Sequence, residues 1–276
     1  MKYILLIIME EMKMQKPFDA WKNIDHIVGW IKQYFVVEAD ANTKAVIGIS
    51  GGKDSTIAAA LLCRAIGPER VVAVMMPQGE QDDIDDAYDV CDYLKIPEEN
   101  RFEIDISSTV NALYKATYID DLPPVVTTNT PARVRMTTLY LIAGLVGGRV
   151  CNTGNSSELY IGYTTKFGDL AGDFSLFRNY TVREVLAIGD KLGLPKHLVH
   201  KAPADGLSGQ TDEEKTGIPY EVLDAYILDN TIPDYDTFRK IKELNRAAQH
   251  KRRTICITAP YPVFEREDRL VCEEEF

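Results

Sequence analysis

The stretch from Val46 to Ser55, with the sequence VIGISGGKDS, constrains the fold of this chain more than any other. An apolar run typical of a strand leads into a Ser/Gly turn, and the alanine-rich segment that follows is a strong helix former. A strand, a glycine loop and a helix N-terminus in succession direct backbone N–H groups and the helix dipole at one place. The sequence therefore predicts an anion site of phosphate size in this loop.

The residue types in the loop refine this prediction. Gly51 and Gly52 let the backbone turn and approach a ligand closely. Ser50 and Ser55 can donate hydroxyl hydrogen bonds, and Ser55 can also cap the helix. Asp54 would repel a phosphate unless a divalent cation lies between them. The spacing of the common P-loop is absent, and the alternative reading is a plain glycine turn between a buried strand and a helix.

Composition limits the classes of partner. The chain has 276 residues, enough for one large α/β domain or two small ones. Hydrophobic residues make up 45 % and charged residues 26 %, as in an ordinary soluble globular protein. A net charge of −11 and a pI near 4.9 argue against nonspecific nucleic-acid binding and against an anionic membrane surface. The apolar run 3–9 is too short to span a bilayer. We expect neither a nucleic-acid nor a membrane partner.

The cysteines indicate the redox compartment. They are dispersed, form no C-x-x-C pair and are odd in number, which favours free thiols in a cytoplasmic protein over a zinc site or a disulfide framework. The four histidines form no metal-ligand cluster in the sequence. The cysteines are Cys63, Cys91, Cys151, Cys256 and Cys272.

Hydrophobic periodicity predicts strands that alternate with helices. This order is typical of an α/β fold with a doubly wound parallel sheet flanked by helices, here a single domain with extra N- and C-terminal helices. Ligands of such sheets bind outside the carboxyl ends of the strands, where the loops 50–55, 77–81 and 152–158 gather. The predicted strands are 44–49, 70–76, 101–106 and 149–151; the predicted helices are 18–34, 56–65, 81–94, 107–114, 131–146, 155–161, 181–192, 221–228 and 234–248; the predicted loops include 163–175 and 202–217.

Several polar segments beyond the first loop are ambiguous when each is taken alone. Arg133 and Arg135 lie two apart at a helix start, so only one of them faces a given ligand. Glu158 lies in the first turn of a predicted helix, where a carboxylate is also a routine cap. A polar segment of this kind more often lies on the surface than in a functional site.

Six segments taken in order resemble the ammonia-dependent NAD synthetase family of the ATP pyrophosphatase superfamily: SGGKDS, ARVRM, NTGNSSE, YTTKFGD, DGLSGQTDEE and HKRR. Other ATP pyrophosphatases share only the first segment. The resemblance covers roughly residues 18–260, which we expect to form the domain, with peripheral segments at 1–17 and 261–276. It implies ATP-dependent amidation of deamido-NAD⁺ by ammonia through an acyl adenylate, giving NAD⁺, AMP and pyrophosphate, with Mg²⁺ as cofactor and a homodimer that holds the substrate across its interface.

The resemblance also implies roles for single residues. Asp54 and Glu158 match the metal ligands, and Asp54 and Asp173 are the catalytic candidates. We hypothesise that Asp173 helps to deprotonate ammonium. The expected ATP contacts are Gly48, Ile49, Ser50, Gly51, Gly52, Lys53, Asp54, Ser55 and Thr153. The expected contacts to deamido-NAD⁺ are Arg133, Lys166, Asp173, His250 and Lys251.

Two positions depart from the family pattern. Asn179 aligns where the family usually has a lysine that contacts ATP, and Ala204 aligns where Thr or Ser often follows a proline. The charge missing at Asn179 could come from a neighbouring cation. The candidates are Arg178, Arg183 and Lys201.

Two other functions compete with this reading. One is another ATP pyrophosphatase, of the amidase or tRNA-modifying type, but the latter needs neighbouring cysteines and a basic face. The other is a non-catalytic adenine-nucleotide sensor, which would need the loop but not Glu158, Lys166 and Asp173 together. A fused glutaminase would need about 200 further residues, so free ammonia is the expected donor unless a separate glutaminase docks.

Overall fold

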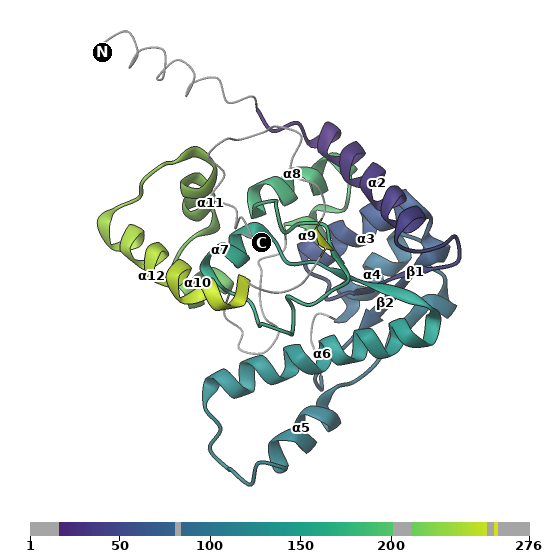
Figure 1. The fold of residues 1–276 in the computed structure, drawn as a ribbon, viewed down its shortest axis with the longest axis horizontal. Coiled ribbons are helices and arrows are strands. Elements are labelled where there is room, and N and C mark those ends of the chain that lie inside the picture. Colours follow the sequence, from purple (N-terminus) through teal and green to yellow (C-terminus); the bar gives the residue numbers. More distant parts are fainter. Residues whose placement is uncertain (1–16, 81–83, 201–210, 253–256, 259–276) are drawn as a thin grey trace.

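A parallel sheet lies at the centre of the molecule (Figure 1). The computed structural model describes residues 17–80, 84–200, 211–252 and 257–258. Within them the sheet has six strands in the order β3-β2-β1-β4-β5-β6, so the chain builds outward from β1 to β3 and then returns to β4 on the other side of β1. The switch point lies between β1 and β4, where ligands of such folds bind. The strands are β1 (Lys44–Gly48), β2 (Val71–Met75), β3 (Arg101–Glu103), β4 (Gly148–Asn152), β5 (Phe174–Ser175) and β6 (Ile257–Thr258).

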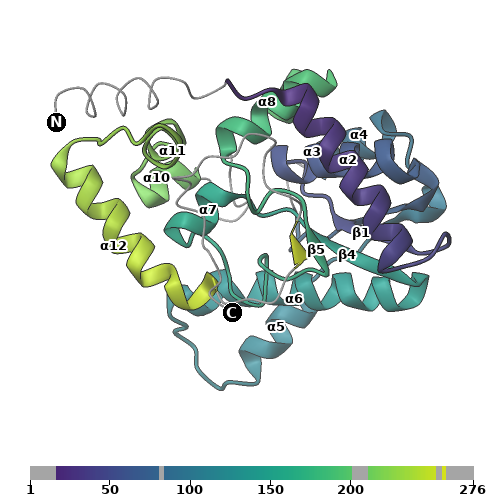
Figure 2. The same ribbon diagram turned by 45° about the horizontal axis from the view of Figure 1, so that its top comes forward.

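Helices cover both faces of the sheet (Figure 2). α2, α3 and α8 pack together on one face, and α6 packs against β1 and β4 on the other. The helices are α2 (Ala20–Val37), α3 (Lys53–Ile66), α4 (Ile84–Tyr93), α5 (Ser107–Lys115), α6 (Pro124–Val146), α7 (Ser156–Ile161), α8 (Val182–Leu192), α9 (Lys196–Val199), α10 (Asp212–Thr216), α11 (Tyr220–Asp229) and α12 (Tyr235–Arg252), with short 3₁₀ turns at Pro68–Arg70 and Glu98–Asn100.

Alternating side chains of the central strands form two separate cores. Successive residues of a strand point to opposite faces. Ala45 and Ile47 therefore join the core under α2, α3 and α8, whereas Val46 joins the core under α6. Because both faces are covered, the central strand β2 is apolar and buried along its whole length, as is typical of a parallel sheet.

A third apolar cluster joins α7, α11 and α12 beside the sheet. Ile161 of α7, Leu223 of α11 and Ile241 of α12 are buried in it. The packing brings the C-terminal end of α12 next to the loop that follows α7, although the two segments are distant in sequence. This arrangement matters for the site described below.

The structure confirms the doubly wound parallel fold and the four predicted strands. Besides the two 3₁₀ turns, four short elements were not predicted: α9 follows the predicted helix 181–192, β5 lies at the end of the predicted loop 163–175, α10 lies in the predicted loop 202–217, and β6 follows the last predicted helix. Elements of two to five residues are too short to show a periodic pattern. Of the predicted peripheral segments 1–17 and 261–276, all but residue 17 lies outside the described residues.

The predicted start of α6 at Pro131 is wrong. The helix begins at Pro124, and Pro131 lies inside it. Proline has no N–H, so the carbonyl of Thr127, four residues earlier, loses its helical donor. The hydroxyl of Tyr114 in α5 donates to this carbonyl over 3.2 Å. The sequence could not reveal this compensation, because it comes from a different helix.

In the part of the chain that is described, no helix combines the length and the apolar character needed to cross a bilayer. Within the described residues, Cys63 and Cys91 are unpaired thiols. Burial raises the pKa of Cys63 to about 12 and that of Cys91 to about 11. Cys256 and Cys272 lie outside the described residues, and the cytoplasmic location stays a prediction.

Candidate active site

The loop 49–52 lies at the carboxyl end of β1, and the residues Gly48–Ser55 run from this strand into α3. Gly51 has a φ of +74°, and a Cβ atom built there would lie 2.7 Å from the Cβ of Asp86 in α4. The loop therefore requires glycine at this position, both for its left-handed backbone and for the close approach of α4.

Hydroxyl groups inside the loop fix its shape. The amide of Ser50 donates to the Ser55 hydroxyl over 3.3 Å, and the amide of Gly52 donates to the Ser50 hydroxyl over 3.3 Å. The predicted capping by Ser55 is wrong, because α3 begins at Lys53 with Gly52 as its N-cap, and the Ser55 hydroxyl donates to the Gly52 carbonyl over 3.0 Å. Among the side chains that the structure describes, none caps this helix start. Its first amides are therefore suited to bind an anion.

Asn155 joins the two predicted metal ligands. Its side-chain amide donates to Asp54 Oδ1 over 3.2 Å, and its side-chain oxygen accepts from the Glu158 amide over 3.0 Å. Its backbone amide donates to Glu158 Oε2 over 3.2 Å. One buried residue at the N-terminus of α7 thus positions a carboxylate on α3 and a carboxylate on α7.

The pair of carboxylates is electrostatically strained. Burial, together with the charge of Asp54, raises the pKa of Glu158 to about 8. Lys53 lies beside the pair, with its Nζ atom 2.9 Å from Asp54 Oδ2. Burial alone would lower the pKa of Lys53, but the carboxylates of Asp54 and Glu158 outweigh this effect and hold the pKa above its usual value.

Asp212 and Tyr220 complete the surroundings of Lys53. The Lys53 Nζ atom lies 5.7 Å from the centroid of the Tyr220 ring, within the range of a cation–π contact. Asp212 of α10 is buried and adds a further negative charge. Among the described residues, the buried Tyr220 hydroxyl finds no hydrogen-bond partner. Burial raises the pKa of this phenol far above its usual value, and nearby negative charge adds to the effect.

Three of the predicted substrate contacts meet in one chain of hydrogen bonds. Arg133 of α6 donates from Nε to the carbonyl of Lys166 over 3.3 Å, and Lys166 Nζ donates to the carbonyl of His250 over 2.8 Å. Arg135 instead donates over 3.1 Å to the carbonyl of Met76, the residue that follows β2. The prediction that the two arginines point in different directions is confirmed.

Lys251 has a different surrounding from its neighbour His250. Its Nζ atom donates to the carbonyls of Gly162 and Thr164, over 2.7 and 2.6 Å. Burial lowers the pKa of Lys251, and the charge of Arg133 adds to this effect. In this structure Lys251 therefore holds the loop after α7 in place.

Thr153 directly follows β4, at the same edge of the sheet as the loop 49–52. Asn152, the last residue of β4, fixes this turn by accepting from the Gly154 amide over 3.0 Å. The predicted ATP contacts thus come from two neighbouring strands, on either side of the switch point between β1 and β4.

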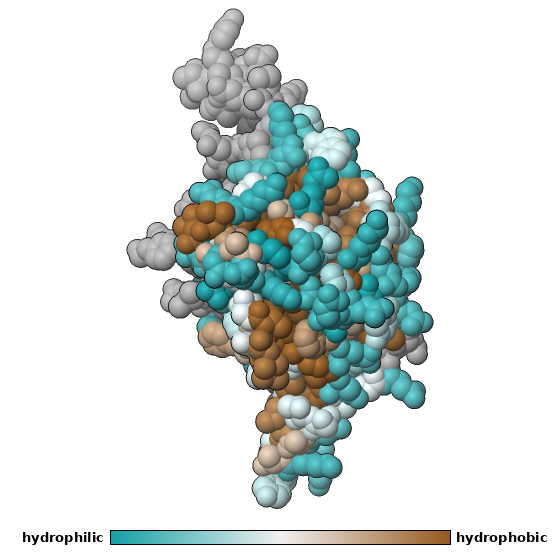
Figure 3. Space-filling model, turned by 90° about the vertical axis from the view of Figure 1, so that its right-hand side faces the viewer, coloured by the Kyte–Doolittle hydropathy of each residue, from teal (hydrophilic) through white to brown (hydrophobic). Residues whose placement is uncertain are grey.

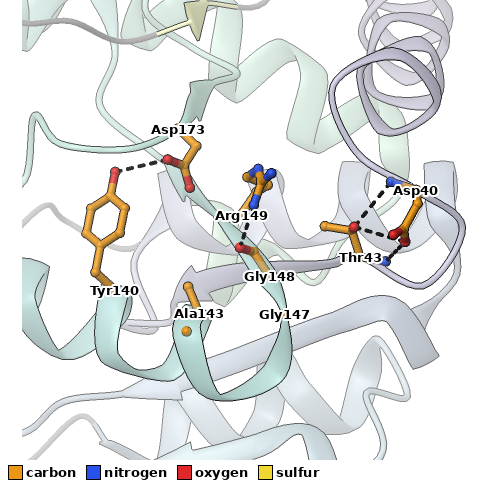
Figure 4. A pocket seen from close by; sticks show the side chains of 9 residues that line it. Asp40, Thr43, Tyr140, Ala143, Gly147, Gly148, Arg149 and Asp173 are labelled. Atoms are coloured by element: carbon orange, nitrogen blue, oxygen red, sulfur yellow. Dashed lines mark hydrogen bonds between the residues drawn. The ribbon is translucent and has the colours of Figure 1, made fainter.

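Asp173 lies away from the loop 49–52. It accepts from the amide of Val150 over 2.7 Å and from the Tyr140 hydroxyl over 3.4 Å. It faces a cavity of about 560 Å³ near the amino ends of β1 and β4 (Figure 4). The structure does not bring Asp173 to the loop 49–52, which lies at the opposite edge of the sheet. The cavity is lined by Asp40, Thr43, Tyr140, Ala143, Gly144, Gly147, Gly148, Arg149 and Asp173.

The departures from the family pattern are resolved in part. Asn179 is buried just before α8. Arg183 forms a two-pronged ion pair with Asp229, at 2.8 and 3.0 Å, and Arg178 donates to the carbonyl of Arg252 over 3.0 Å. These arginines therefore have other partners. The remaining candidate cation, Lys201, and the second departing position, Ala204, lie outside the described residues.

Sequence reasoning missed the parts of the site that act through other residues. Asn155 and Glu158 form a reciprocal capping box, for which the N-x-x-E spacing is a visible signal. Asp212 and Tyr220 carry no local signal. In the described residues no group of three or more His, Cys, Asp or Glu side chains is arranged to hold a metal ion, so any metal at Asp54 and Glu158 would need ligands from elsewhere.

Comparison with known proteins gives consistent matches. A family model described as NAD synthase matches residues 23–255. The NH(3)-dependent NAD(+) synthetase of Alkaliphilus metalliredigens is 36 % identical over 237 residues, which cover 83 % of this chain and 94 % of that protein.

Two solved structures extend the match to the fold. An NMN synthetase from Francisella tularensis has a TM-score of 0.79 at 30 % identity. The match covers 90 % of this chain and 100 % of that protein. An NH3-dependent NAD synthetase from Campylobacter jejuni has a TM-score of 0.69 at 27 % identity and covers 87 % of this chain and 99 % of its own.

Proposed function

The chain belongs to the NAD synthase family and is a C–N ligase that makes NAD⁺ with ammonia, and we propose that it does so at the carboxyl edge of its sheet, around the loop 49–52. ATP is a substrate of this reaction. The observation that carries the proposal is the link from Asn155 to both Asp54 and Glu158, beside an uncapped helix start suited to phosphate.

The reaction we propose has two steps. The nicotinate carboxylate of deamido-NAD⁺ attacks the α-phosphorus of ATP, and the bond to pyrophosphate breaks. Ammonia then attacks the acyl carbon of the adenylate, loses a proton and releases AMP. The first amides of α3 hold the polyphosphate in line for attack, which is the main contribution that a protein makes to phosphoryl chemistry.

The residues present fit a divalent cation. Asp54 and Glu158 offer hard oxygen donors, and the mutual repulsion that raises the pKa of Glu158 is what a cation would relieve. Magnesium sites at nucleotides commonly combine one or two carboxylates with substrate phosphates and water. We therefore assign Mg²⁺ to this pair. Its contribution would be to neutralise charge on the departing pyrophosphate.

An extended substrate fits along α6. Arg133 lies near the catalytic edge, and Tyr140, seven residues later, lies beside the cavity that Asp173 faces. Seven residues of helix span about 10 Å, which suits two halves of a dinucleotide. Arg133, Lys166 and His250 would hold the nicotinate half, and Asp173 and Arg149 would contact the distal half. This assignment makes Asp173 a binding residue rather than the base for ammonium.

A second copy of the chain is the partner that we propose. Tyr140, Leu141 and Leu145 of α6 are 38, 60 and 71 % exposed. Figure 3 shows apolar side chains gathered on the face where the C-terminal end of α6 reaches the surface. An apolar stripe of this kind beside the substrate cavity suits a symmetric contact through α6. A homodimer would then close the cavity from outside.

A second candidate substrate is nicotinate mononucleotide, amidated by the same chemistry. The TM-score to the Francisella NMN synthetase, 0.79, favours it, compared with 0.69 for the Campylobacter NAD synthetase. A mononucleotide would occupy only the half of α6 near Arg133. The cavity beside Asp173 supports the dinucleotide as the better substrate.

The test is an assay of the purified protein with ATP and Mg²⁺. Deamido-NAD⁺ and nicotinate mononucleotide are compared as acceptors, and ammonium and glutamine are compared as donors. We expect NAD⁺ to form from deamido-NAD⁺ and ammonium, with one pyrophosphate per NAD⁺. Amidation of the mononucleotide alone would instead establish the second candidate, and tight ATP binding without any amide product would count against both.

A further inference from the structure

Lys53 is a cation in an unusual place. It is the first residue of α3, where the helix dipole disfavours positive charge, and it is only 5 % exposed. Burying an ammonium group without partners is costly. Its position therefore depends on the carboxylates around it.

The contacts of Lys53 coincide with those that a metal would need. Its Nζ atom lies 2.9 Å from Asp54 Oδ2, while Asp54 Oδ1 accepts from the Asn155 side chain over 3.2 Å. Both oxygens of Asp54 are thus engaged. Glu158 and Asp212 contribute further negative charge around the ammonium group, and the Tyr220 ring lies over it at 5.7 Å.

We infer that Lys53 is a tethered counter-ion that occupies the cation position beside Asp54 until the nucleotide arrives, so that metal enters this site together with ATP and not alone. The inference rests on the proposed metal pair, Asp54 and Glu158. A free divalent cation must displace an ammonium group that the chain holds in place. ATP changes this balance, because its phosphates offer the ammonium group a new anionic partner at the same loop.

The flexible side chain of lysine makes this exchange possible. Four methylene groups let the ammonium group move by several ångströms while the backbone of α3 stays fixed. Once the ammonium group has moved to the phosphates, Asp54 Oδ2 is free to bind metal. Lys53 then acts as a positioning residue in two states. Before the nucleotide binds, it neutralises the carboxylates, and after the nucleotide has bound, it adds positive charge beside the polyphosphate.

The test measures Mg²⁺ binding by isothermal titration calorimetry, without nucleotide and with α,β-methylene ATP, which resists cleavage at the reacting bond. The variant is Lys53→Met, which keeps the length of the side chain and removes its charge. Lys196→Met is the control, since Lys196 lies exposed on α9 and its replacement changes the net charge equally. Lys53→Gln is a second variant in case Lys53→Met does not fold.

Without nucleotide, we expect Lys53→Met to bind Mg²⁺ at least roughly ten-fold more tightly than the wild type, because a full positive charge has been removed from the site. With α,β-methylene ATP, the difference should shrink or reverse. Lys196→Met should match the wild type. Thermal unfolding gives a second readout, in which Mg²⁺ alone should raise the Tm of Lys53→Met but not that of the wild type.

Two results would overturn the inference. If the wild type and Lys53→Met bind Mg²⁺ equally well without nucleotide, Lys53 does not compete with metal, and the metal pair itself stands. If neither protein binds Mg²⁺ even with α,β-methylene ATP, the metal pair fails as well. The two failures are therefore distinguishable.

Discussion

Asn155 and Asp54, 101 positions apart in the chain, are joined by a hydrogen bond of 3.2 Å from the side-chain amide to the carboxylate. This bond ties the N-terminus of α7 to the N-terminus of α3 across the switch point of the sheet. The same asparagine also forms the capping box with Glu158. A single side chain thus sets the separation of the two carboxylates.

The first prediction concerns this asparagine. Asn155→Ala should lower kcat/KM by roughly 10- to 100-fold, the usual effect of removing a group that orients metal ligands. It should also raise the Mg²⁺ concentration needed for half-maximal activity, because the two carboxylates are no longer held together. The measurement is a Mg²⁺ titration of NAD⁺ formation.

Asn245→Ala is the matched control for Asn155→Ala. Asn245 of α12 also uses its side-chain amide to hold another element, by donating to the Tyr160 carbonyl over 2.9 Å, but it does not contact the carboxylates. It should leave the Mg²⁺ requirement unchanged. A wild-type Mg²⁺ requirement in Asn155→Ala would contradict the positioning role.

The second prediction concerns the shape of the phosphate loop. Gly51→Ala puts a Cβ atom 2.7 Å from Asp86 and strains a backbone with a φ of +74°. We expect a loss of about 1–3 kcal/mol in the free energy of unfolding and weaker ATP binding, since the loop must shift. Denaturant unfolding and ATP titration measure the two effects.

Gly29→Ala is the control for the glycine prediction. Gly29 lies on the exposed side of α2, and a Cβ atom there meets nothing within 4 Å. The change should stabilise the protein by up to about 1 kcal/mol, because alanine is the better helix former. Equal stability of Gly51→Ala and the wild type would show that the loop tolerates a side chain.

The third prediction is a pH dependence of stability. In the folded protein the pKa of Glu158 is raised from its usual 4.5 to about 8, chiefly by burial. Between these values the folded state keeps a proton that the unfolded chain has lost. The contribution of Glu158 to stability is therefore present at low pH and is lost as the pH rises from 4.5 towards 8.

Glu158→Gln removes this proton equilibrium. Without metal, the free energy of unfolding of the wild type should fall relative to the variant by up to about 1.4 kcal/mol per pH unit in this window. Asp169 and Asp224, whose pKa values burial raises to about 6, titrate in both proteins and cancel in the comparison. Parallel stability profiles of the two proteins would rule out a raised pKa for Glu158.

The sequence predicted the fold and the first loop because their signals are local. The run from Val46 to Ser55 contains its own strand, turn and helix start, and β1 and α3 follow from it. The role of Asn155 toward Asp54 was not predictable, because it depends on the pairing of β1 with β4. The extension of α6 before Pro131 was missed for the same reason: the Tyr114 hydroxyl that makes it possible belongs to α5.

The fourth prediction separates two roles for Asp173. Asp173→Asn keeps an acceptor for the amide of Val150 but removes the charge. If Asp173 contacts the distal half of the dinucleotide, the KM for deamido-NAD⁺ should rise by roughly ten-fold, the effect of about 1.4 kcal/mol. The KM for ammonium should not change. Any turnover of nicotinate mononucleotide should also be unaffected, since the mononucleotide is too short to reach the cavity beside Asp173.

The opposite pattern would restore the hypothesis that Asp173 deprotonates ammonium. In that case turnover would fall most at low ammonium, and the KM for deamido-NAD⁺ would stay near its wild-type value. The placement of Asp173 beside the cavity near the amino ends of β1 and β4 argues against this result, because the site that we propose for the acyl adenylate lies at the other edge.

The fifth prediction concerns assembly through α6. Leu145 is 71 % exposed and lies at the C-terminal end of α6, directly after the cavity residue Gly144 and two residues before the cavity residue Gly147. Leu145→Glu places two like charges near each other in a symmetric contact, where neither finds a partner. We expect the dimer to weaken by about 3 kcal/mol, roughly a hundred-fold in Kd, as measured by sedimentation velocity.

Activity should fall together with the dimer, because the proposed contact closes the cavity beside Asp173. Ile232→Glu is the control: Ile232 is 72 % exposed, but it lies between α11 and α12, away from α6. It should leave both assembly and activity unchanged. A Leu145→Glu protein that sediments as the wild type does would exclude α6 as the contact, and a monomeric variant with full activity would show that one copy completes the site alone.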